Sequence, residues 1–150
     1  MKKLIISILL LVCTMAAQAV VKRVQYRGLT YVVDTELQIA QLARQNVIIK
    51  GNLPIPETIT YKDKVSGQLI ECPVVSIAKY ALEGQKKLKS LYIPASVQEI
   101  GDCAFANCRR LRHIYFDSSL GANADRKSWL KGTKADIQFV LKPGESVSIH

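Results

Sequence analysis

Apolar and polar positions in the middle of the chain follow a pattern that repeats after 23 residues. The segment IAKYALEGQKKLKSLYIPASVQE aligns without a gap on IGDCAFANCRRLRHIYFDSSLGA. Five aligned positions are identical: Ile77 with Ile100, Ala81 with Ala104, Leu88 with Leu111, Tyr92 with Tyr115, and Ser96 with Ser119. A repeat of this length predicts a solenoid, because one unit cannot bury its apolar face without a neighbour.

Each unit contains a form of the motif LxxLxL, as LKSLYI and LRHIYF. Alternation sends the fourth and sixth residues to one face and the fifth to the other, which predicts a short strand with one buried side. The pattern recurs at Ile137-Gln138-Phe139, which is 23 residues after Ile114-Tyr115-Phe116. It also occurs in LPIPETI, where Leu53 lies 38 residues before Leu91. The longer offset predicts a hairpin inserted near residues 60–75, with its turn near Lys64 to Gly67.

The predicted fold class is an α/β solenoid of about four stacked parallel strands, with short helical or turn returns and a β-rich N-terminal cap. In the return IGDCAFANC, Gly101 permits a tight turn and Asp102 is a candidate helix cap. We assign residues 20–52 to the N-terminal cap, 53–120 to the repeats, and 121–150 to a degenerate last repeat with the C-terminal cap.

Within the N-terminal cap, RGLTYVV, ELQIAQLAR and NVIIK are predicted strands, with a turn near Asp34-Thr35. The apolar period of residues 36–44 also fits a helix, so a helix is the alternative for that segment.

The first nineteen residues have the organisation of a secretory signal peptide. Lys2 and Lys3 precede an apolar run from Leu4 to Val12, and small residues end the segment at Ala17-Gln18-Ala19. The run is far shorter than the ~20 apolar residues that span a bilayer. We therefore expect an exported protein, secreted, periplasmic or at the cell surface, without a transmembrane segment after cleavage. Acylation of Cys13 is a less favoured alternative, because Val12 stands where a lipoprotein needs a small residue.

The charge balance is basic, which is compatible with an acidic partner or with no specific partner. The chain has 21 Lys+Arg and 12 Asp+Glu, a formal net charge of +9, and loss of Lys2 and Lys3 with the leader leaves +7. Such a balance suits nucleic acid, acidic glycan or an anionic membrane. Export makes nucleic acid an unexpected partner, so an acidic glycan is the polyanion that remains.

The few cysteines and histidines argue against a catalytic or metal site. Cys72, Cys103 and Cys108 are an odd number in an exported chain, and we expect small buried side chains, although a disulfide between two of them stays open. No CxxC or HxxH spacing accompanies them, and the repeat directs Cys108 inward and His113 outward. The sequence therefore predicts no enzyme, no metal and no cofactor.

The segment IPASVQEIGDCAFANCRRLRHIYF, from Ile93 to Phe116, resembles the BspA-like leucine-rich repeats of bacterial surface proteins, whose pattern is IxxLxxLxIPxSVxxIGxxAFxxCxxLxxI. The resemblance covers about Val75 to Ser119, and LPIPETITY looks like the family's usual opening segment. Three residues depart from the pattern: Ala78, Leu82 and Gln85 stand where the family has Gly, Phe and Cys. The resemblance implies an exported adhesion-type or protein-binding domain without known catalytic residues.

The repeat register brings cations and tyrosines of neighbouring units together. We expect one group of side chains to face outward from the strands as a partner-binding face: Lys89, Tyr92, Arg112, His113, Tyr115 and Gln138. A basic patch lies beside it, formed by Lys86, Lys87, Arg109 and Arg110. We predict a protein-interaction or adhesion module that binds a host or surface protein, with acidic glycan as the alternative partner. A solvated basic face whose tyrosines merely cover the sheet is the third interpretation.

Overall fold

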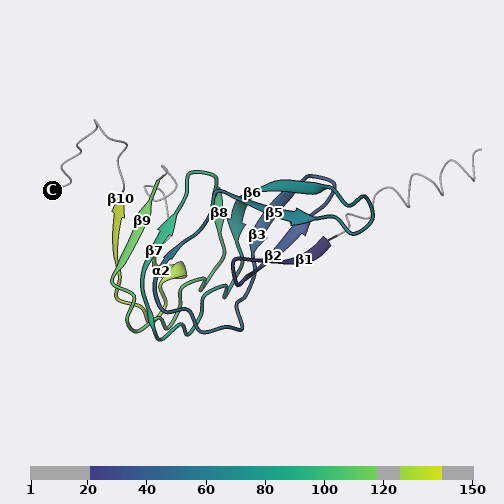
Figure 1. Ribbon diagram of the computed structural model, residues 1–150. Coiled ribbons are helices and arrows are strands. Elements are labelled where there is room, and N and C mark those ends of the chain that lie inside the picture. Colours follow the sequence, from purple (N-terminus) through teal and green to yellow (C-terminus); the bar gives the residue numbers. More distant parts are fainter. Residues whose placement is uncertain (1–20, 118–125, 140–150) are drawn as a thin grey trace, which may run out of the picture.

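The computed structural model describes residues 21–117 and 126–139, as two sheets with one continuous core (Figure 1). The predicted leader, residues 1–19, and much of the predicted C-terminal cap lie outside the described residues. Within the described part of the chain, no helix is long and apolar enough to cross a membrane.

The first sheet is mixed and combines the N-terminal cap with the inserted hairpin. Its strands are β1 (Val21–Tyr26), β2 (Leu29–Asp34), β3 (Ile39–Leu42), β5 (Thr58–Lys62), β6 (Leu69–Ile77) and β8 (Glu99–Ile100). The order is β1-β2-β3-β6-β5, and β8 also pairs with β6. β1, β2 and β3 form an antiparallel meander, whereas β6 runs parallel to β3 and to β8. The strands at its two edges, β1 and β5, contact each other, which shows that the sheet is curled.

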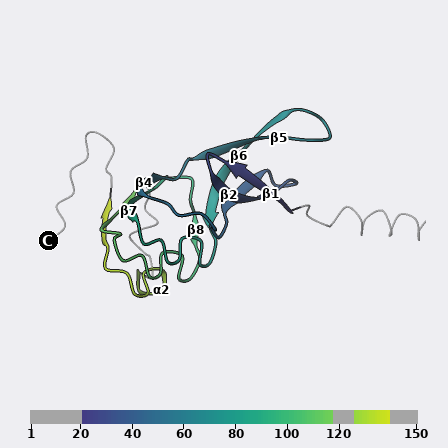
Figure 2. The same cartoon turned by 60° about the horizontal axis from the view of Figure 1, so that its bottom comes forward.

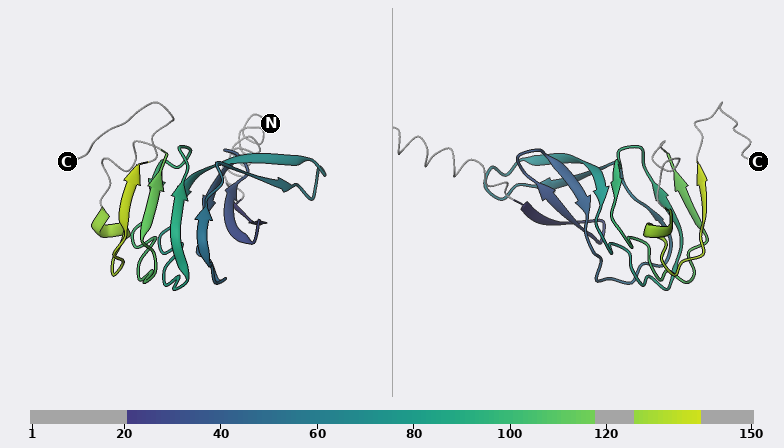
Figure 3. Two further views of the ribbon diagram at one scale, coloured as in Figure 1. Left: turned by 60° about the vertical axis from the view of Figure 1, so that its left-hand side comes forward. Right: turned by 180° about the vertical axis from the view of Figure 1, so that it is seen from behind.

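The second sheet consists of the repeat strands, and all of its pairs are parallel. Its strands are β4 (Gly51–Pro54), β7 (Leu88–Ile93), β9 (His113–Phe116) and β10 (Asp136–Phe139), in the order β10-β9-β7-β4 (Figure 3). Leu53, Leu91, Ile114 and Ile137 align in one row. The strand pairing that the offsets of 23 and 38 residues predict is therefore present.

The returns between repeat strands are turns. Backbone hydrogen bonds link one return to the next, as from Leu82 N–H to the Ala104 carbonyl at 2.8 Å and from Phe105 N–H to the Trp129 carbonyl at 3.1 Å. In the described residues the only helix is α2 (Arg126–Trp129). The prediction that Asp102 caps a helix is wrong: the turn around it is not helical, and its carboxylate accepts a hydrogen bond from the Ser128 hydroxyl.

In the N-terminal cap, the strand predicted within residues 36–44 is confirmed as β3, and the alternative of a helix is wrong. Asp34 Oδ1 accepts hydrogen bonds from the backbone of Glu36 and Leu37 and closes a turn before β3. One prediction needs correction. The segment NVIIK, residues 46–50, is not a strand. Only Ile49 of its apolar residues is buried, while Ile48 remains 71% exposed.

The hairpin β5–β6 extends away from the stacked repeat strands (Figure 2). It covers residues 58–77, and its turn is closed by a 2.8 Å hydrogen bond from Asp63 N–H to the Gln68 carbonyl. At the base of this turn, Lys22 Nζ of β1 lies 2.9 Å from Asp63 Oδ1. This ion pair joins the two edges of the curled sheet.

One buried cluster runs through both sheets. It begins with Leu29 and Tyr31 in β2, continues through Leu82 and Phe105 in the returns, and ends at Trp129 in α2. Tyr31 is fully buried, and burial raises the pKa of its hydroxyl to about 12. The continuous core fixes the repeat strands, so the outward side of the second sheet is a rigid surface.

Candidate functional site

The outward side of the second sheet follows from alternation along its strands. In β7 the side chains of Leu91 and Ile93 are buried, whereas Tyr92 between them is half-exposed. β9 repeats this pattern, with Tyr115 half-exposed between two buried residues. Pairing aligns these outward residues in two rows across the strands: Asn52, Ser90 and His113 form the first, and Pro54, Tyr92 and Tyr115 form the second.

A shallow hollow of about 530 Å³ lies at the end of this side where β7 and β9 begin. We call it the basic hollow; its lining residues are Asn52, Lys89, Ser90, Arg110, Arg112, His113 and Tyr115. Three of them are cations and none is acidic. The two ion pairs of the described residues, Lys22–Asp63 and Arg44–Glu83, involve none of these cations. The basic hollow is therefore an uncompensated positive site open to solvent.

Backbone and side-chain hydrogen bonds hold the hollow in shape. The Arg112 N–H donates to the Lys89 carbonyl at 2.9 Å, which aligns the two segments that carry these cations. Ser90 Oγ donates to Asn52 Oδ1 at 2.7 Å across β7 and β4. The ring of His113 lies 6.1 Å from that of Tyr115, tilted by 33°, and its Nδ1 is buried without a hydrogen-bond partner in the described structure. The imidazole nitrogen is thus an unused polar group beside the cations.

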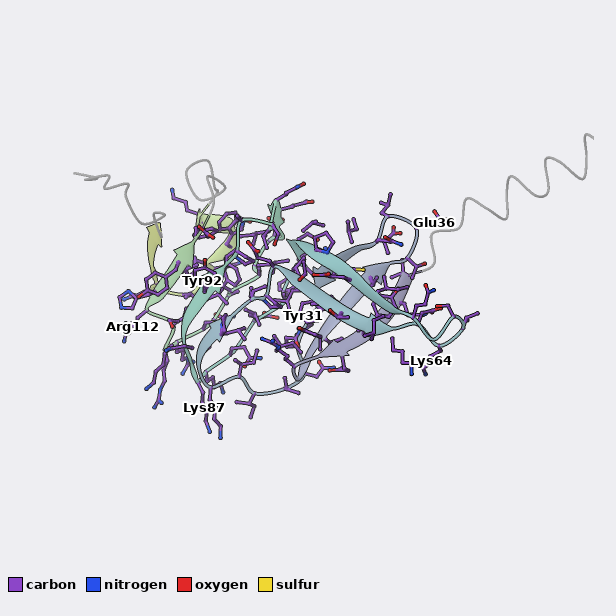
Figure 4. All side chains as sticks on the ribbon, turned by 45° about the horizontal axis from the view of Figure 1, so that its top comes forward. Tyr31, Glu36, Lys64, Lys87, Tyr92 and Arg112 are labelled. Atoms are coloured by element: carbon purple, nitrogen blue, oxygen red, sulfur yellow. The ribbon has the colours of Figure 1, made fainter. Side chains whose placement is uncertain are left out.

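At the other end of the strands the environment is acidic. Burial raises the pKa of Tyr92, and a hydrogen bond with the Asp117 carboxylate and the negative charges of Asp117 and Glu57 raise it further. The Tyr92 hydroxyl therefore keeps its proton at neutral pH and acts as a hydrogen-bond donor. Figure 4 shows Arg112 and Lys87 at one end of the repeat strands, with Tyr92 farther along them.

The structure brings five of the ten predicted site residues together in the basic hollow. Lys89, Arg112, His113 and Tyr115 line the basic hollow, and Arg110 of the predicted basic patch joins them. Tyr92 lies on the same side of the sheet but outside the hollow. The other members of the basic patch are exposed on the neighbouring turns: Lys86, Lys87 and Arg109.

Two residues need separate comment. The backbone of Gln138 pairs with Tyr115, but its side chain lies outside what the structure describes. Asn52 was not predicted as a site residue, because it lies before the inserted hairpin. The signal for it was nevertheless present, since the offset of 38 residues that aligns Leu53 with Leu91 also aligns Asn52 with Ser90.

No catalytic arrangement involves the cysteines of the described chain. Cys108 is fully buried, its thiol donates to the Leu82 carbonyl at 3.0 Å, and burial raises the pKa of this thiol. His113 lies in the basic hollow instead, so thiol and imidazole are apart. Cys72, Cys103 and Cys108 are free thiols here. Among the described residues, no group of three or more His, Cys, Asp or Glu side chains is placed to hold a metal ion.

Comparison with known proteins assigns the repeat. The family model described as BspA type Leucine rich repeat region (6 copies) matches residues 55–126. A search of curated proteins found no match to the chain.

Two solved structures share the fold. A leucine-rich repeat protein from Bacteroides capillosus is 20% identical, with a TM-score of 0.53, and the match covers 77% of this chain and 98% of that one. A leucine rich cell surface protein from Faecalibacterium prausnitzii is 18% identical, with a TM-score of 0.52, and the match covers 79% of this chain. This chain spans only 30% of that larger protein.

Proposed function

Because this chain is a BspA-type leucine-rich repeat protein, we propose that it is an exported adhesion or protein-interaction module that binds a protein partner through the outward side of its second sheet. One observation carries the proposal: the repeat aligns Tyr92 with Tyr115 on a rigid sheet, directly beside the cations of the basic hollow. The similarity to a bacterial cell surface protein supports export to the cell surface or beyond.

The residue types on this side suit a protein interface. Tyrosine and arginine are enriched among the residues that contribute most to binding energy, because each combines a large contact area with a polar end. Tyr92 and Tyr115 lie on neighbouring strands, about 4.8 Å apart along the sheet, so a partner meets both rings at once. Both are half-exposed and held by buried neighbours in their strands. Little side-chain freedom is therefore lost on binding.

The test is recovery of a partner from the fluid or surface that the exported protein meets. We expect Tyr92→Ala with Tyr115→Ala to reduce recovery about tenfold or more, since each loss removes a central aromatic contact. The matched control is Val65→Ala with Leu69→Ala, which removes exposed apolar side chains from the hairpin instead. Equal recovery by the wild type and the tyrosine variant would refute this use of the sheet.

An acidic glycan is a second candidate partner, favoured by the uncompensated charge of the basic hollow. Lys86, Lys87 and Arg109 extend this charge over the neighbouring turns. Binding that depends on charge weakens steeply as salt rises, so the elution position from a heparin column measures it.

The variant for this candidate neutralises six cations with glutamine: Lys86, Lys87, Lys89, Arg109, Arg110 and Arg112. A control variant of equal net charge neutralises six exposed cations elsewhere: Arg23, Arg27, Lys50, Lys62, Lys64 and Lys79. We expect only the first variant to elute at much lower salt than the wild type. Coincident elution of the two variants would eliminate a specific glycan site.

A further inference from the structure

The outward side of the second sheet is polarised along its strands. Its cations lie where the strands begin: Lys89 at the start of β7 and Arg112 just before β9. Its acids lie where the strands end: Glu57 after β4 and Asp117 directly after β9. All strands of this sheet are parallel, so their beginnings share one edge and their ends share the other. Positive and negative charge are thus separated across a single surface.

The acidic end is a convergent site. Asp117, through a hydrogen bond and its negative charge, and Glu57, through its negative charge, both raise the pKa of the Tyr92 hydroxyl. The Asp117 N–H donates to the Ile93 carbonyl at 3.0 Å, which fixes the residue at the end of its strand. Two carboxylates that follow strands of this sheet therefore act on one phenol by their charge, at the end of the strands opposite the basic hollow.

The distance between the basic hollow and the acidic end defines the length of a ligand that can reach both. His113, in the hollow, and Asp117 are four residues apart, which is about 13 Å along a strand. This is longer than the screening length of about 8 Å in physiological salt, so a bound group interacts mainly with the end nearest to it. An extended peptide that lies along the strands covers the same distance in four residues.

We propose that this surface binds an extended peptide segment of the protein partner, with an acidic side chain in the basic hollow and a basic side chain between Glu57 and Asp117. The inference rests on the proposed function and specifies the chemistry of the partner. The acidic side chain meets Lys89, Arg110 and Arg112, and the basic one meets the two carboxylates beside Tyr92. The backbone between them lies over Tyr92 and Tyr115.

Charge complementarity favours such a segment over a uniform polyanion. A sulfated glycan long enough to cover both ends places negative groups against Glu57 and Asp117, and like charges brought together at an interface oppose binding. A polycation meets the same difficulty at the basic hollow. Only an occupant with both signs of charge, about 13 Å apart, is complementary to both ends.

Selection from a random peptide library tests the proposal on the full exported protein. The peptides are about twelve residues long, so they span up to about 40 Å when extended and reach across both ends of the sheet. We expect the enriched peptides to carry Asp or Glu and Lys or Arg about four positions apart, in one preferred order.

A charge-reversed variant makes the test specific. Arg112→Glu with Asp117→Lys lowers the charge of the basic hollow from +3 to +1 and leaves the acidic end, where Glu57 remains, without net charge. The net charge of the protein is unchanged, and we expect the wild-type peptides to bind about tenfold or more weakly. The control is Lys62→Glu with Glu71→Lys, the same exchange between exposed residues of the hairpin. We expect the control to bind these peptides as the wild type does.

The outcomes separate this inference from the proposed function. The inference is overturned if the enriched peptides are uniformly acidic. It is also overturned if they bind the charge-reversed variant as well as the wild type but bind Tyr92→Ala with Tyr115→Ala more weakly. Both results leave the proposed interaction surface intact. If no peptide is enriched, or if the enriched peptides ignore the tyrosine substitutions as well, the proposed function fails together with the inference.

Discussion

The side-chain carbonyl of Gln85 accepts a hydrogen bond from the backbone N–H of Ile49 at 2.9 Å. The amide of the same side chain donates to the Val47 carbonyl, also at 2.9 Å. Gln85 is 6% exposed, so these bonds are shielded from water. The segment before β4 therefore obtains backbone hydrogen bonds from a side chain of the first repeat unit, in place of a strand partner.

This contact explains a departure from the repeat pattern. Gln85 occupies the position that Cys108 has in the next unit. The Cys108 thiol contacts the preceding unit by donating to the Leu82 carbonyl at 3.0 Å. Thr133, in the segment that follows, bonds the backbone of the Cys108 unit: its Oγ1 accepts from the Cys108 N–H at 2.9 Å and donates to the Phe105 carbonyl at 2.6 Å. A cysteine side chain at position 85 is too short to hold the irregular segment, whereas glutamine provides both a donor and an acceptor.

We predict that Gln85→Leu lowers the free energy of unfolding by about 1–3 kcal/mol, because it leaves a buried N–H and a carbonyl without partners. Gln85→Cys, which restores the family's residue, should also destabilise the protein. Urea denaturation measures both effects. Asn46→Leu, at an exposed position of the same segment, should change stability by no more than about 0.5 kcal/mol. A Gln85→Cys protein as stable as the wild type would contradict this account.

The contrast between β7 and residues 46–50 shows how far the sequence determines the fold. The strand LKSLYI recurs in the sequence, so its register against β9 follows from the 23-residue period and its register against β4 from the 38-residue offset of LPIPETI. NVIIK has a similar local composition, but whether it forms a strand depends on what lies beside it. Its partner is Gln85, which is 36 residues from Ile49 in the chain, and no local period reports such a contact.

The sequence likewise predicts only part of the candidate site. The repeat register predicts that Lys89 lies beside Arg112 and Tyr92 beside Tyr115, because each pair is one period apart. It does not predict that Arg110 enters the hollow while Arg109 stays outside, since the path of the turn decides this. The acidic end was not predicted either, because Glu57 and Asp117 belong to positions that follow the strands and share no motif.

Gly101 has no room for a side chain. The reason is the close approach of neighbouring backbone, and not the tight turn for which the sequence suggested this glycine. A Cβ at this position would lie 2.8 Å from Lys79 Cα and 2.9 Å from the Ala78 carbonyl carbon, where the preceding repeat passes. We predict that Gly101→Ala costs about 1–3 kcal/mol in unfolding free energy, because backbone must move.

Gly67 provides the control for Gly101. Its φ is +71° and a Cβ there meets open space, so Gly67→Ala is opposed only by backbone strain. Asparagine adopts this conformation more easily than alanine, so Gly67→Asn should be milder than Gly67→Ala. Gly101→Asn should instead be more damaging than Gly101→Ala, because the larger side chain has less room. The opposite order at position 101, measured by urea denaturation, would exclude the steric explanation.

The three free thiols should differ in reactivity. Cys72 and Cys108 are fully buried, and burial raises the pKa of both thiols, whereas Cys103 is partly exposed. Under reducing conditions we expect iodoacetamide to modify Cys103 much faster than the other two, since alkylation requires an accessible thiolate. Mass spectrometry of the digested protein locates the modified residue. In denaturing urea all three should react alike, and equal rates in the native protein would show that the returns open readily.

The ion pair between Lys22 and Asp63 should stabilise the closed edge of the first sheet in a defined pH window. Hydrogen bonds from the Ser66 backbone, Lys22 and the Ser66 hydroxyl hold the pKa of Asp63 well below its usual range, and the bond to Asp63 raises the pKa of Lys22. A carboxylate with a lowered pKa stabilises the fold above its unfolded pKa of about 3.9, and this contribution fades as the pH falls from there. The lysine's contribution fades as the pH rises beyond its ordinary value of 10.5.

Lys22→Met tests this window, because it removes the cation and leaves the Ser66 bonds to Asp63 in place. We expect the thermal midpoint of the variant to lie below that of the wild type from about pH 5 to 9, and the difference to shrink below about pH 4 and above about pH 10.5. Arg23→Met, which removes an exposed cation from the next position of β1, should show no such pH dependence. High salt should also reduce the difference, because the pair is near the surface. A difference that stays constant from acid to mildly alkaline pH would mean that Lys22 acts by packing against Tyr61, whose ring centroid is 5.5 Å from its Nζ, and not by charge.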